Sequence, residues 1–265
     1  MKKVTNILFD LDNTLVRCMV YYEFIRKNMF RKFSELSGLE YEEISKIFTN
    51  FERNRIKRPD GFDRNAFLDS INETRIEILN RITDEEKRKN YIESDEPFKM
   101  INFGDQVYNA PYTKYDDVDI VLSQLKDMGI NLYIVTKGSF YIQSQKVMEL
   151  PKVFSGLFVI PHKNKSIWKG IAEAIEADFN TTYVVGDSVK DDILPALEAG
   201  LKAVHISRGN TSWVGDPTMN VPVGVDSIVE LKQLLDVLFK ETSFEYHEQL
   251  SLIPMLTVKA NGEVE

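Results

Sequence analysis

A chain of 265 residues is long enough to bury a full hydrophobic core, as one large domain or two smaller ones. Its composition, with 43% hydrophobic and 28% charged residues, is typical of an ordinary soluble globular protein. The formal net charge of −8 argues against a nucleic-acid binder that works through a basic surface. The single cysteine, Cys18, excludes an intrachain disulfide, suits a reducing compartment and is expected to be a small buried apolar residue.

The N-terminal apolar segment breaks at Asp10, which is too early for a signal peptide. No run reaches the ~18 apolar residues that a membrane-spanning helix needs. We therefore expect a cytoplasmic protein that binds neither membranes nor nucleic acids. The sequence predicts no oligomeric state.

The first expected element is a strand from Val4 to Phe9, rich in the β-branched and large apolar residues of a strand buried in a parallel sheet. Two aspartates follow it, Asp10 and Asp12. In an extended chain they point to the same side, so that their carboxylates share one small volume. Such close like charges favour a shared cation or a raised pKa on one of them. The alternative interpretation is an Asp/Asn turn that caps the next helix.

Residues 17–112 carry helical patterns and no convincing strand. Apolar residues recur at helical spacing in three stretches, with a weaker fourth stretch: residues 19–38, 41–51, 63–82 and 84–94. A helical cap domain inserted between the first strand and the rest of a sheet explains this block economically.

Two short connections would join this cap to the rest of the chain, near residues 17–20 and 109–113, and we expect them to act as hinges. The turn RPDGF at residues 58–62 is the most conspicuous break in the block and a candidate contact with a substrate pocket.

From Tyr115 onward, predicted helices alternate with strands. The strands are expected at residues 130–136, 157–160, 182–185 and 203–206, and a last helix at residues 228–239. This alternation indicates βαβ units and an α/β, doubly wound, Rossmann-like parallel sheet. The expected core therefore comprises residues 1–16 and 113–240, with the cap at residues 17–112 and a C-terminal extension at residues 241–265.

Polar side chains follow three of these strands: Asp10 and Asp12, Thr136, and Asp187. In open α/β sheets, ligands bind at the carboxyl ends of the strands, where these residues would meet. The segment GDSVKDD adds Asp191 and Asp192, either of which could simply complement a helix dipole. Clustered carboxylates are the ligands that Mg²⁺ prefers, often together with a substrate phosphate.

Residues 136–139, TKGS, supply a hydroxyl and a backbone turn before a helix whose N-terminus could bind phosphate. Lys163 and Lys165 lie just before another helix, where a cation opposes the dipole. That position favours a functional role for one of the two, and surface solvation is the alternative.

Taken together, these motifs resemble those of the haloacid dehalogenase-like hydrolase superfamily, specifically a phosphatase-type member with a helical (C1-type) cap. Its four motifs would be DLDNT at residues 10–14, Thr136, a lysine, and GDSVKDD at residues 186–192. The family's spacing favours Lys163, which lies 24 residues before Asp187. The same comparison selects Asp192, five residues after Asp187, over Asp191. Lys137 departs from the family pattern, because many members have Asn or Ser there.

The resemblance implies a Mg²⁺-dependent hydrolase of a small phosphorylated metabolite. Asp10 would be the nucleophile that forms an aspartyl-phosphate, and Asp12 the general acid and base, with a pKa raised relative to that of Asp10. Thr136, Lys137 and Lys163 would bind the phosphate. The metal site would comprise Asp10, Asp12 through its backbone carbonyl, Asp187, and Asp192 behind the direct ligands.

Four alternatives are open at this stage. A phosphomutase would keep all these residues, whereas a 2-haloacid dehalogenase would not need Asp12, because a halide leaves without a proton. A phospho-receiver domain begins with adjacent acids and places its lysine last, unlike this chain. A binding protein with a dead site would lack a catalytic side chain, and here none is missing.

Overall fold

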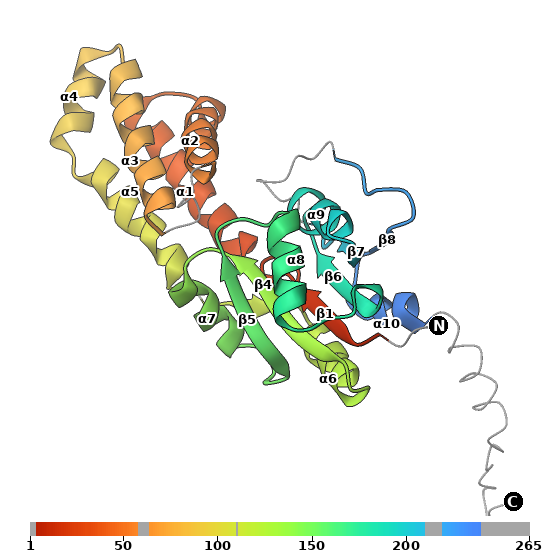
Figure 1. The fold of residues 1–265 in the computed structure, drawn as a ribbon. Helices are drawn as coiled ribbons and strands as arrows, with labels where there is room; N and C mark the ends of the chain where they lie inside the picture. The colour runs from red at the N-terminus through yellow and green to blue at the C-terminus, as the bar shows by residue number, and fades with distance from the viewer. Residues whose placement is uncertain (1–3, 58–63, 110, 210–218, 240–265) are drawn as a thin grey trace, which may run out of the picture.

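The computed structural model describes residues 4–57, 64–109, 111–209 and 219–239. Its centre is a six-stranded sheet whose neighbouring strands all run parallel, in the order β5-β4-β1-β6-β7-β8 (Figure 1). In that order the strands are Phe154–Ile160, Asn131–Lys137, Asn6–Phe9, Thr182–Gly186, Lys202–Ile206 and Asp226–Ile228. Because the strands are parallel, their carboxyl ends all lie at one edge. The chain therefore has the predicted doubly wound α/β core.

Both faces of the sheet are covered by helices. On β1, Ile7 and Phe9 belong to one apolar cluster and Leu8 to the other, as the two-residue period of a strand requires. The first cluster includes residues of α6 (Val118–Asp127) and α10 (Gln233–Phe239), and the second includes residues of α8 (Lys165–Ala174) and α9 (Leu194–Glu198). Helix α7 (Phe140–Met148) follows β4. Two short elements, η2 (Phe179–Thr181) and the π-helical turn η3 (Val189–Ile193), flank β6.

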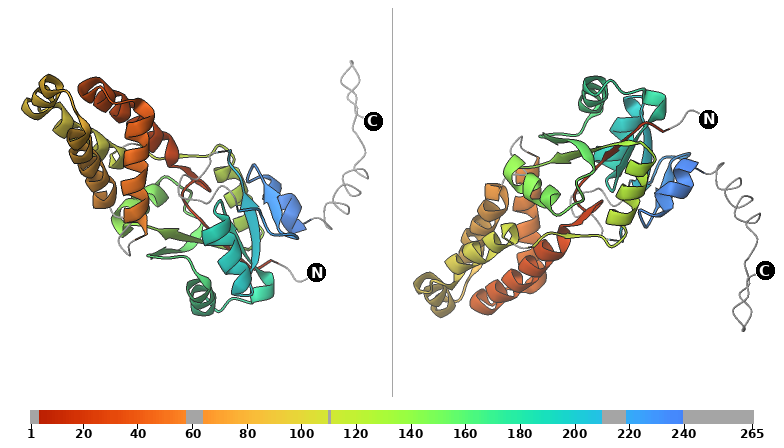
Figure 2. Two further views of the ribbon diagram at one scale, coloured as in Figure 1. Left: turned by 90° about the horizontal axis from the view of Figure 1, so that it is seen from above. Right: turned by 90° about the horizontal axis from the view of Figure 1, so that it is seen from below.

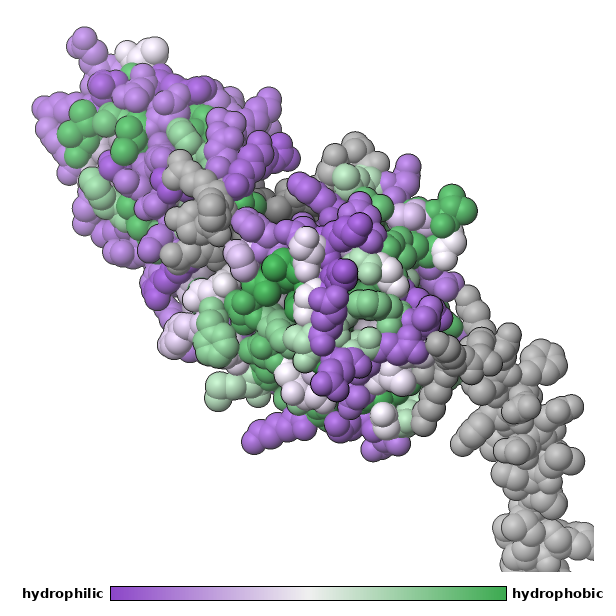
Figure 3. All heavy atoms as spheres, viewed as in Figure 1, coloured by the Kyte–Doolittle hydropathy of each residue, from purple (hydrophilic) through white to green (hydrophobic). Residues whose placement is uncertain are grey.

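A helical insertion lies between β1 and the rest of the sheet, at one end of the molecule (Figures 1 and 2). We use this name for the segment from α1 to η1. Its elements are α1 (Met19–Ser37), α2 (Tyr41–Ile56), α3 (Arg64–Arg81), α4 (Glu85–Glu93), α5 (Glu96–Asp105) and η1 (Gln106–Tyr108). It has an apolar cluster of its own, with Met29, Phe33, Phe48, Ile71 and Ile78 at its centre. The face of the insertion seen in Figure 3 is mainly hydrophilic, as expected of helices that turn their apolar sides inward.

The two connections of the insertion run side by side. Strand β2 (Val16–Arg17) pairs antiparallel with β3 (Thr113–Lys114), so that the chain enters and leaves the insertion through one narrow ribbon. This ribbon lies at the domain boundary that we proposed from the sequence. A narrow pair of strands with few contacts is a suitable place for a hinge.

Helix ends in the insertion follow their local sequence. Helix α1 ends at Gly38, which adopts a left-handed conformation with φ of 74° and donates its N–H to the carbonyl of Ser34. Helix α4 begins after Asp84, whose side chain accepts the N–H of Lys87. Both boundaries agree with the helical stretches predicted from the sequence.

Two elements differ from the prediction. Helix α5 was not expected, because Gly104 and Pro97 weaken the helical pattern there. The last helix begins at Gln233 rather than Ile228, because residues 226–228 form the edge strand β8. The turn at residues 58–62 and the extension at residues 241–265 lie outside the described residues. Among the described helices, none is both long and apolar enough to cross a bilayer.

Candidate active site

The carboxyl edge of the sheet forms one wall of a cavity of about 180 Å³, and the helical insertion forms the other. Every site residue predicted from the sequence lines this cavity: Asp10, Asp12, Thr136, Lys137, Lys163, Asp187 and Asp192. They come from the ends of β1, β4 and β6, from the segment between β5 and α8, and from η3. Residues far apart in the sequence thus meet where the parallel strands end.

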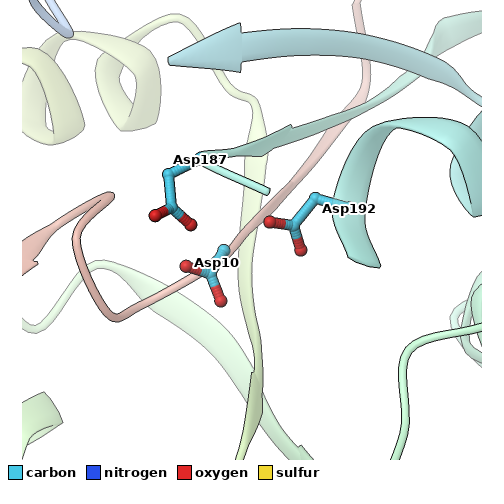
Figure 4. A group of neighbouring side chains, drawn as sticks. All are labelled: Asp10, Asp187 and Asp192. Atoms are coloured by element: carbon cyan, nitrogen blue, oxygen red, sulfur yellow. The ribbon is translucent and has the colours of Figure 1, made fainter. Parts of the chain in front are cut away.

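Three carboxylates meet at the centre of this edge (Figure 4). One oxygen from each of Asp10, Asp187 and Asp192 lies within 4.8 Å of the others. Asp192 packs directly on Gly186, where a β-carbon would lie 2.3 Å from its Oδ2 atom. The backbone N–H of Ser188 donates to the same oxygen at 3.0 Å. The glycine that ends β6 is therefore required for the position of Asp192.

The ammonium group of Lys163 joins two of these acids. It donates to Oδ1 of Asp10 and, at 2.6 Å, to Oδ1 of Asp192, and it is buried. Burial works to lower the pKa of Lys163, but the charges of Asp10 and Asp192 outweigh it and raise that pKa. Lys165 is exposed on the first turn of α8 and does not line the cavity. The structure therefore places Lys163, not Lys165, at the site.

The carboxyl groups of Asp10 and Asp187 are held against ionisation. Burial raises the pKa of Asp10 to about 7, in spite of the opposing charge of Lys163. Burial, together with the charges of Asp10 and Asp192, raises the pKa of Asp187 well above its usual value. A cation between these groups would relieve both effects, since it favours the ionised forms.

Asp12 has a different environment from Asp10. Its Oδ1 accepts from Nζ of Lys146 at 2.6 Å and its Oδ2 from Nε2 of Gln143 at 2.8 Å. Burial favours a raised pKa for Asp12, but the charge of Lys146 and these hydrogen bonds outweigh it and lower the pKa. We expected the pKa of Asp12 to lie above that of Asp10. In the metal-free protein this expectation is wrong, because the two pKa values are shifted in the opposite directions. The reason is the cation on α7, which the sequence motifs do not include.

The remaining predicted residues also lie in the network. Oγ1 of Thr136 is buried and accepts from Nε2 of Gln143 at 2.6 Å. Nζ of Lys137 lies 2.5 Å from Oδ2 of Asp191. Asp191 therefore pairs with Lys137, whereas Asp192 lies with Asp10 and Asp187 in the acidic cluster.

The donor set fits a hard divalent cation. Asp10, Asp187 and Asp192 offer only carboxylate oxygens, close together and partly covered, which is the chemistry that Mg²⁺ prefers. Neither histidine nor cysteine belongs to this group. Lys163 already compensates one of the three carboxylate charges, so that one divalent ion would bring this group to neutrality before a phosphate binds.

Sequence reasoning missed four residues that touch this site. Oγ1 of Thr14 donates to Asp10 at 3.1 Å, and Glu52 of the helical insertion lines the cavity. Gln143 and Lys146 are the buried residues of α7, three positions apart on one face. A helix face occupied by Gln and Lys where apolar residues are expected is the pattern that could have revealed them.

The chain belongs to the haloacid dehalogenase-like hydrolases, whose family model matches residues 4–200. It is 27% identical, over 87% of its length and 95% of the other chain, to a glyceraldehyde 3-phosphate phosphatase of Methanopyrus kandleri. A protein of the same name from Methanocaldococcus jannaschii is 24% identical, with 90% and 100% covered. A haloacid dehalogenase-like hydrolase from Xanthomonas campestris shares the fold, with a TM-score of 0.63, 14% identity and 94% of both chains covered.

Proposed function

We propose that this protein is a Mg²⁺-dependent phosphatase that hydrolyses a small phosphate monoester through an aspartyl-phosphate on Asp10. The observation that carries the proposal is the contact of Lys163 with both Asp10 and Asp192, beside Asp187 and facing the cavity. A buried cation fixed against a buried carboxylate positions that carboxylate for in-line attack and offers a charge to the phosphoryl oxygens.

The chain's own residues account for the steps of the reaction. Asp10 attacks phosphorus with one carboxylate oxygen, while its other oxygen stays oriented by Thr14 or Lys163. Lys163 and Thr136 bind the equatorial phosphoryl oxygens, where the loose transition state spreads its charge. The charge of a bound phosphate dianion would raise the pKa of Asp12 again, so that Asp12 binds the proton that it transfers to the departing alcohol oxygen; it then takes one from the water that hydrolyses the aspartyl-phosphate.

Asp10, Asp187 and the backbone carbonyl of Asp12 would hold the metal, and Asp192 would orient it from behind through its contacts with Lys163 and the Ser188 N–H. When bound, Mg²⁺ would neutralise charge on the carboxylates and the phosphate. Lys137, paired with Asp191, would stand at the rim of the phosphate position.

The relatives named glyceraldehyde 3-phosphate phosphatase support a short sugar or polyol phosphate as the substrate. A cavity of about 180 Å³ suits a small organic group beside the phosphate. A phosphomutase remains the second candidate, because it would use the same residues. The presence of Asp12, held in the cavity by Lys146 and Gln143, favours a proton-requiring leaving group over a halide.

The direct test is turnover of phosphate esters by the parent and by Asp10→Asn, which removes the nucleophile with little change in volume. We expect Mg²⁺-dependent release of phosphate by the parent, reversible loss in chelator, and less than a tenth of the parent rate in the variant. Mass spectrometry of quenched parent enzyme should detect a phosphoryl group on Asp10. Full activity in chelator would refute the metal assignment, and transfer of phosphate to a second hydroxyl would identify a mutase.

A further inference from the structure

Among the described residues, the wall of the cavity opposite the acids carries one charged group. On the helical insertion, the described lining residues that surround it are apolar or aromatic: Met19, Tyr22, Ile56, Phe67 and Tyr108. Glu52, from α2, is the only carboxylate that the described part of the insertion brings to this cavity. A carboxylate in this setting is costly to bury, so its position calls for an explanation.

One oxygen of Glu52 has a partner. Nη2 of Arg26 lies 2.6 Å from Oε1 of Glu52, and the two side chains are 13% and 5% exposed. The guanidinium lies over the rings of Tyr22, Phe48 and Phe67, at 5.5–5.8 Å from their centroids, and does not line the cavity. The ion pair therefore fixes the carboxylate from behind and leaves it as the polar group that a substrate would meet.

The other oxygen, Oε2, accepts no hydrogen bond from the described residues, although the Glu52 residue is only 4% exposed. Two described residues of the insertion wall carry hydroxyls, Tyr22 and Tyr108. Neither of them donates to Glu52, and Tyr108 donates to the carbonyl of Arg64 at 3.1 Å. A carboxylate oxygen that lies on the wall of a cavity and receives no hydrogen bond from the protein is available to a donor on a ligand.

We propose that Oε2 of Glu52 accepts a hydrogen bond from a hydroxyl group of the substrate, and that the enzyme therefore selects phosphate esters of short neutral polyols over esters that carry a carboxylate. This inference rests on the proposed phosphatase activity. The phosphate occupies the acidic edge at Asp10, and the organic group extends across the same cavity towards α2.

The charges of the cavity support this selectivity. Three described cations line the cavity, and each is paired. Lys137 pairs with Asp191, Lys146 with Asp12, and Lys163 with both Asp10 and Asp192. All three belong to the sheet side, so a substrate carboxylate at the insertion wall would meet Glu52 and no cation among the described residues that line this wall. Two facing acceptors without a donor are unfavourable, whereas a hydroxyl donor would satisfy Glu52.

The test compares two esters that differ only at one carbon: glycerol 3-phosphate, with a terminal hydroxyl, and 3-phosphoglycerate, with a carboxylate. For the parent, we expect kcat/KM to be at least roughly tenfold higher for glycerol 3-phosphate. Equal or reversed preference of the parent would overturn the inference. This comparison needs no variant, so it holds even if substitution of Glu52 impairs folding.

Glu52→Gln then assigns the preference to this residue, because the amide keeps the volume and can donate to a carboxylate. We expect the ratio of the two kcat/KM values to fall by roughly tenfold or more, largely through KM. Glu42→Gln is the matched control, since Glu42 is an exposed residue of the same helix, and its ratio should equal that of the parent.

A purely structural role for Glu52 would lower both kcat/KM values by the same factor and leave their ratio unchanged, which would contradict the inference. Failure of the proposed function is distinguishable from this result. In that case the parent itself would hydrolyse neither ester, nor a generic substrate such as acetyl phosphate.

Discussion

Nζ of Lys146 lies 2.6 Å from Oδ1 of Asp12, and the lysine reaches this position from α7, a helix outside the four sequence motifs. Both side chains face the cavity, and Gln143 of the same helix holds the second oxygen of Asp12. The pair fixes the orientation of the proposed general acid and base. It also gives Asp12 a pKa opposite in direction to that of Asp10.

We predict that Lys146→Met raises the pKa of Asp12. In the parent, burial raises the pKa of Asp12 and the charge of Lys146 lowers it. Without this charge, the effect of burial on the pKa is larger than the remaining opposing effects. Carboxyl NMR titration of the metal-free protein, with the Asp12 resonance assigned through Asp12→Asn, measures this shift. An unchanged Asp12 pKa in Lys146→Met would mean that the ion pair does not control the ionisation of this group.

The two lysines of the segment HKNKS provide a matched pair. Lys163→Met removes a buried cation from Asp10 and Asp192, and we expect kcat/KM for any phosphate ester to fall by at least about a hundredfold. Lys165→Met changes an exposed residue two positions away and should leave kcat/KM within about twofold of the parent. Similar losses in both variants would refute the assignment of Lys163.

Gly186 supports the acidic cluster through the space it leaves. In Gly186→Ala the new β-carbon would meet Oδ2 and Cγ of Asp192 at 2.3 and 2.4 Å, so the carboxylate has to move. We expect a weaker Mg²⁺ affinity, by roughly tenfold or more, measured as the metal concentration that gives half-maximal activity and as the metal-dependent shift in Tm. Gly170→Ala on α8 is the control, because no atom lies within 4 Å of its added β-carbon.

These contacts also show how far the sequence could lead. The motif residues Asp10, Thr136, Lys163 and Asp187 meet as predicted because strand ends in a parallel sheet converge, and strand order follows from βαβ alternation. For Lys146, the local pattern of α7 can indicate a polar residue on the packed face of the helix, but it does not say that this residue reaches Asp12. Contacts between distant elements depend on packing, which a local period does not contain.

The missed elements have similar causes. Helix α5 contains Gly104, which normally disfavours a helix, yet a β-carbon there would lie 2.1 Å from Cδ1 of Ile71 on α3. The glycine thus lets the side chain of Ile71 pack directly on the backbone of α5, a tertiary contact that the sequence does not reveal. Strand β8 has three residues, too few for the alternation of a strand to stand out from the helical pattern that follows it.

The helical insertion is predicted to close over the site as a unit, since it has its own apolar core and joins the sheet only through the β2–β3 ribbon. Closure would limit water access until the leaving group departs. Hydrogen exchange with Mg²⁺ and beryllofluoride should show new protection in residues lining the cavity from α1 and α2, and in the ribbon. Protection confined to the loops at the sheet edge would argue against a lid.

The last prediction concerns stability against pH in the absence of metal. The pKa of Asp10 is raised from 3.8 to about 7, so between these values the folded protein binds more protons than the unfolded chain. This group therefore stabilises the fold below about pH 4, and its contribution is lost as pH rises through about 7. Asp10→Asn carries no such proton. The Tm of the variant minus that of the parent, measured in chelator, should therefore increase from pH 5 to pH 7.5 by at least roughly 3 °C.

Asp10→Asn also loses the ion pair with Lys163, which lowers the Tm of the variant. This loss hardly depends on pH between 5 and 7.5, because the raised pKa of Lys163 keeps the lysine charged throughout this range. Asp127→Asn, at an exposed position on α6, is the control and should keep the slope of the parent. Saturating Mg²⁺ should raise the Tm of the parent most at pH 7.5, where the carboxylates have to ionise in close proximity. A difference between variant and parent that stays constant with pH would show that Asp10 is ionised throughout.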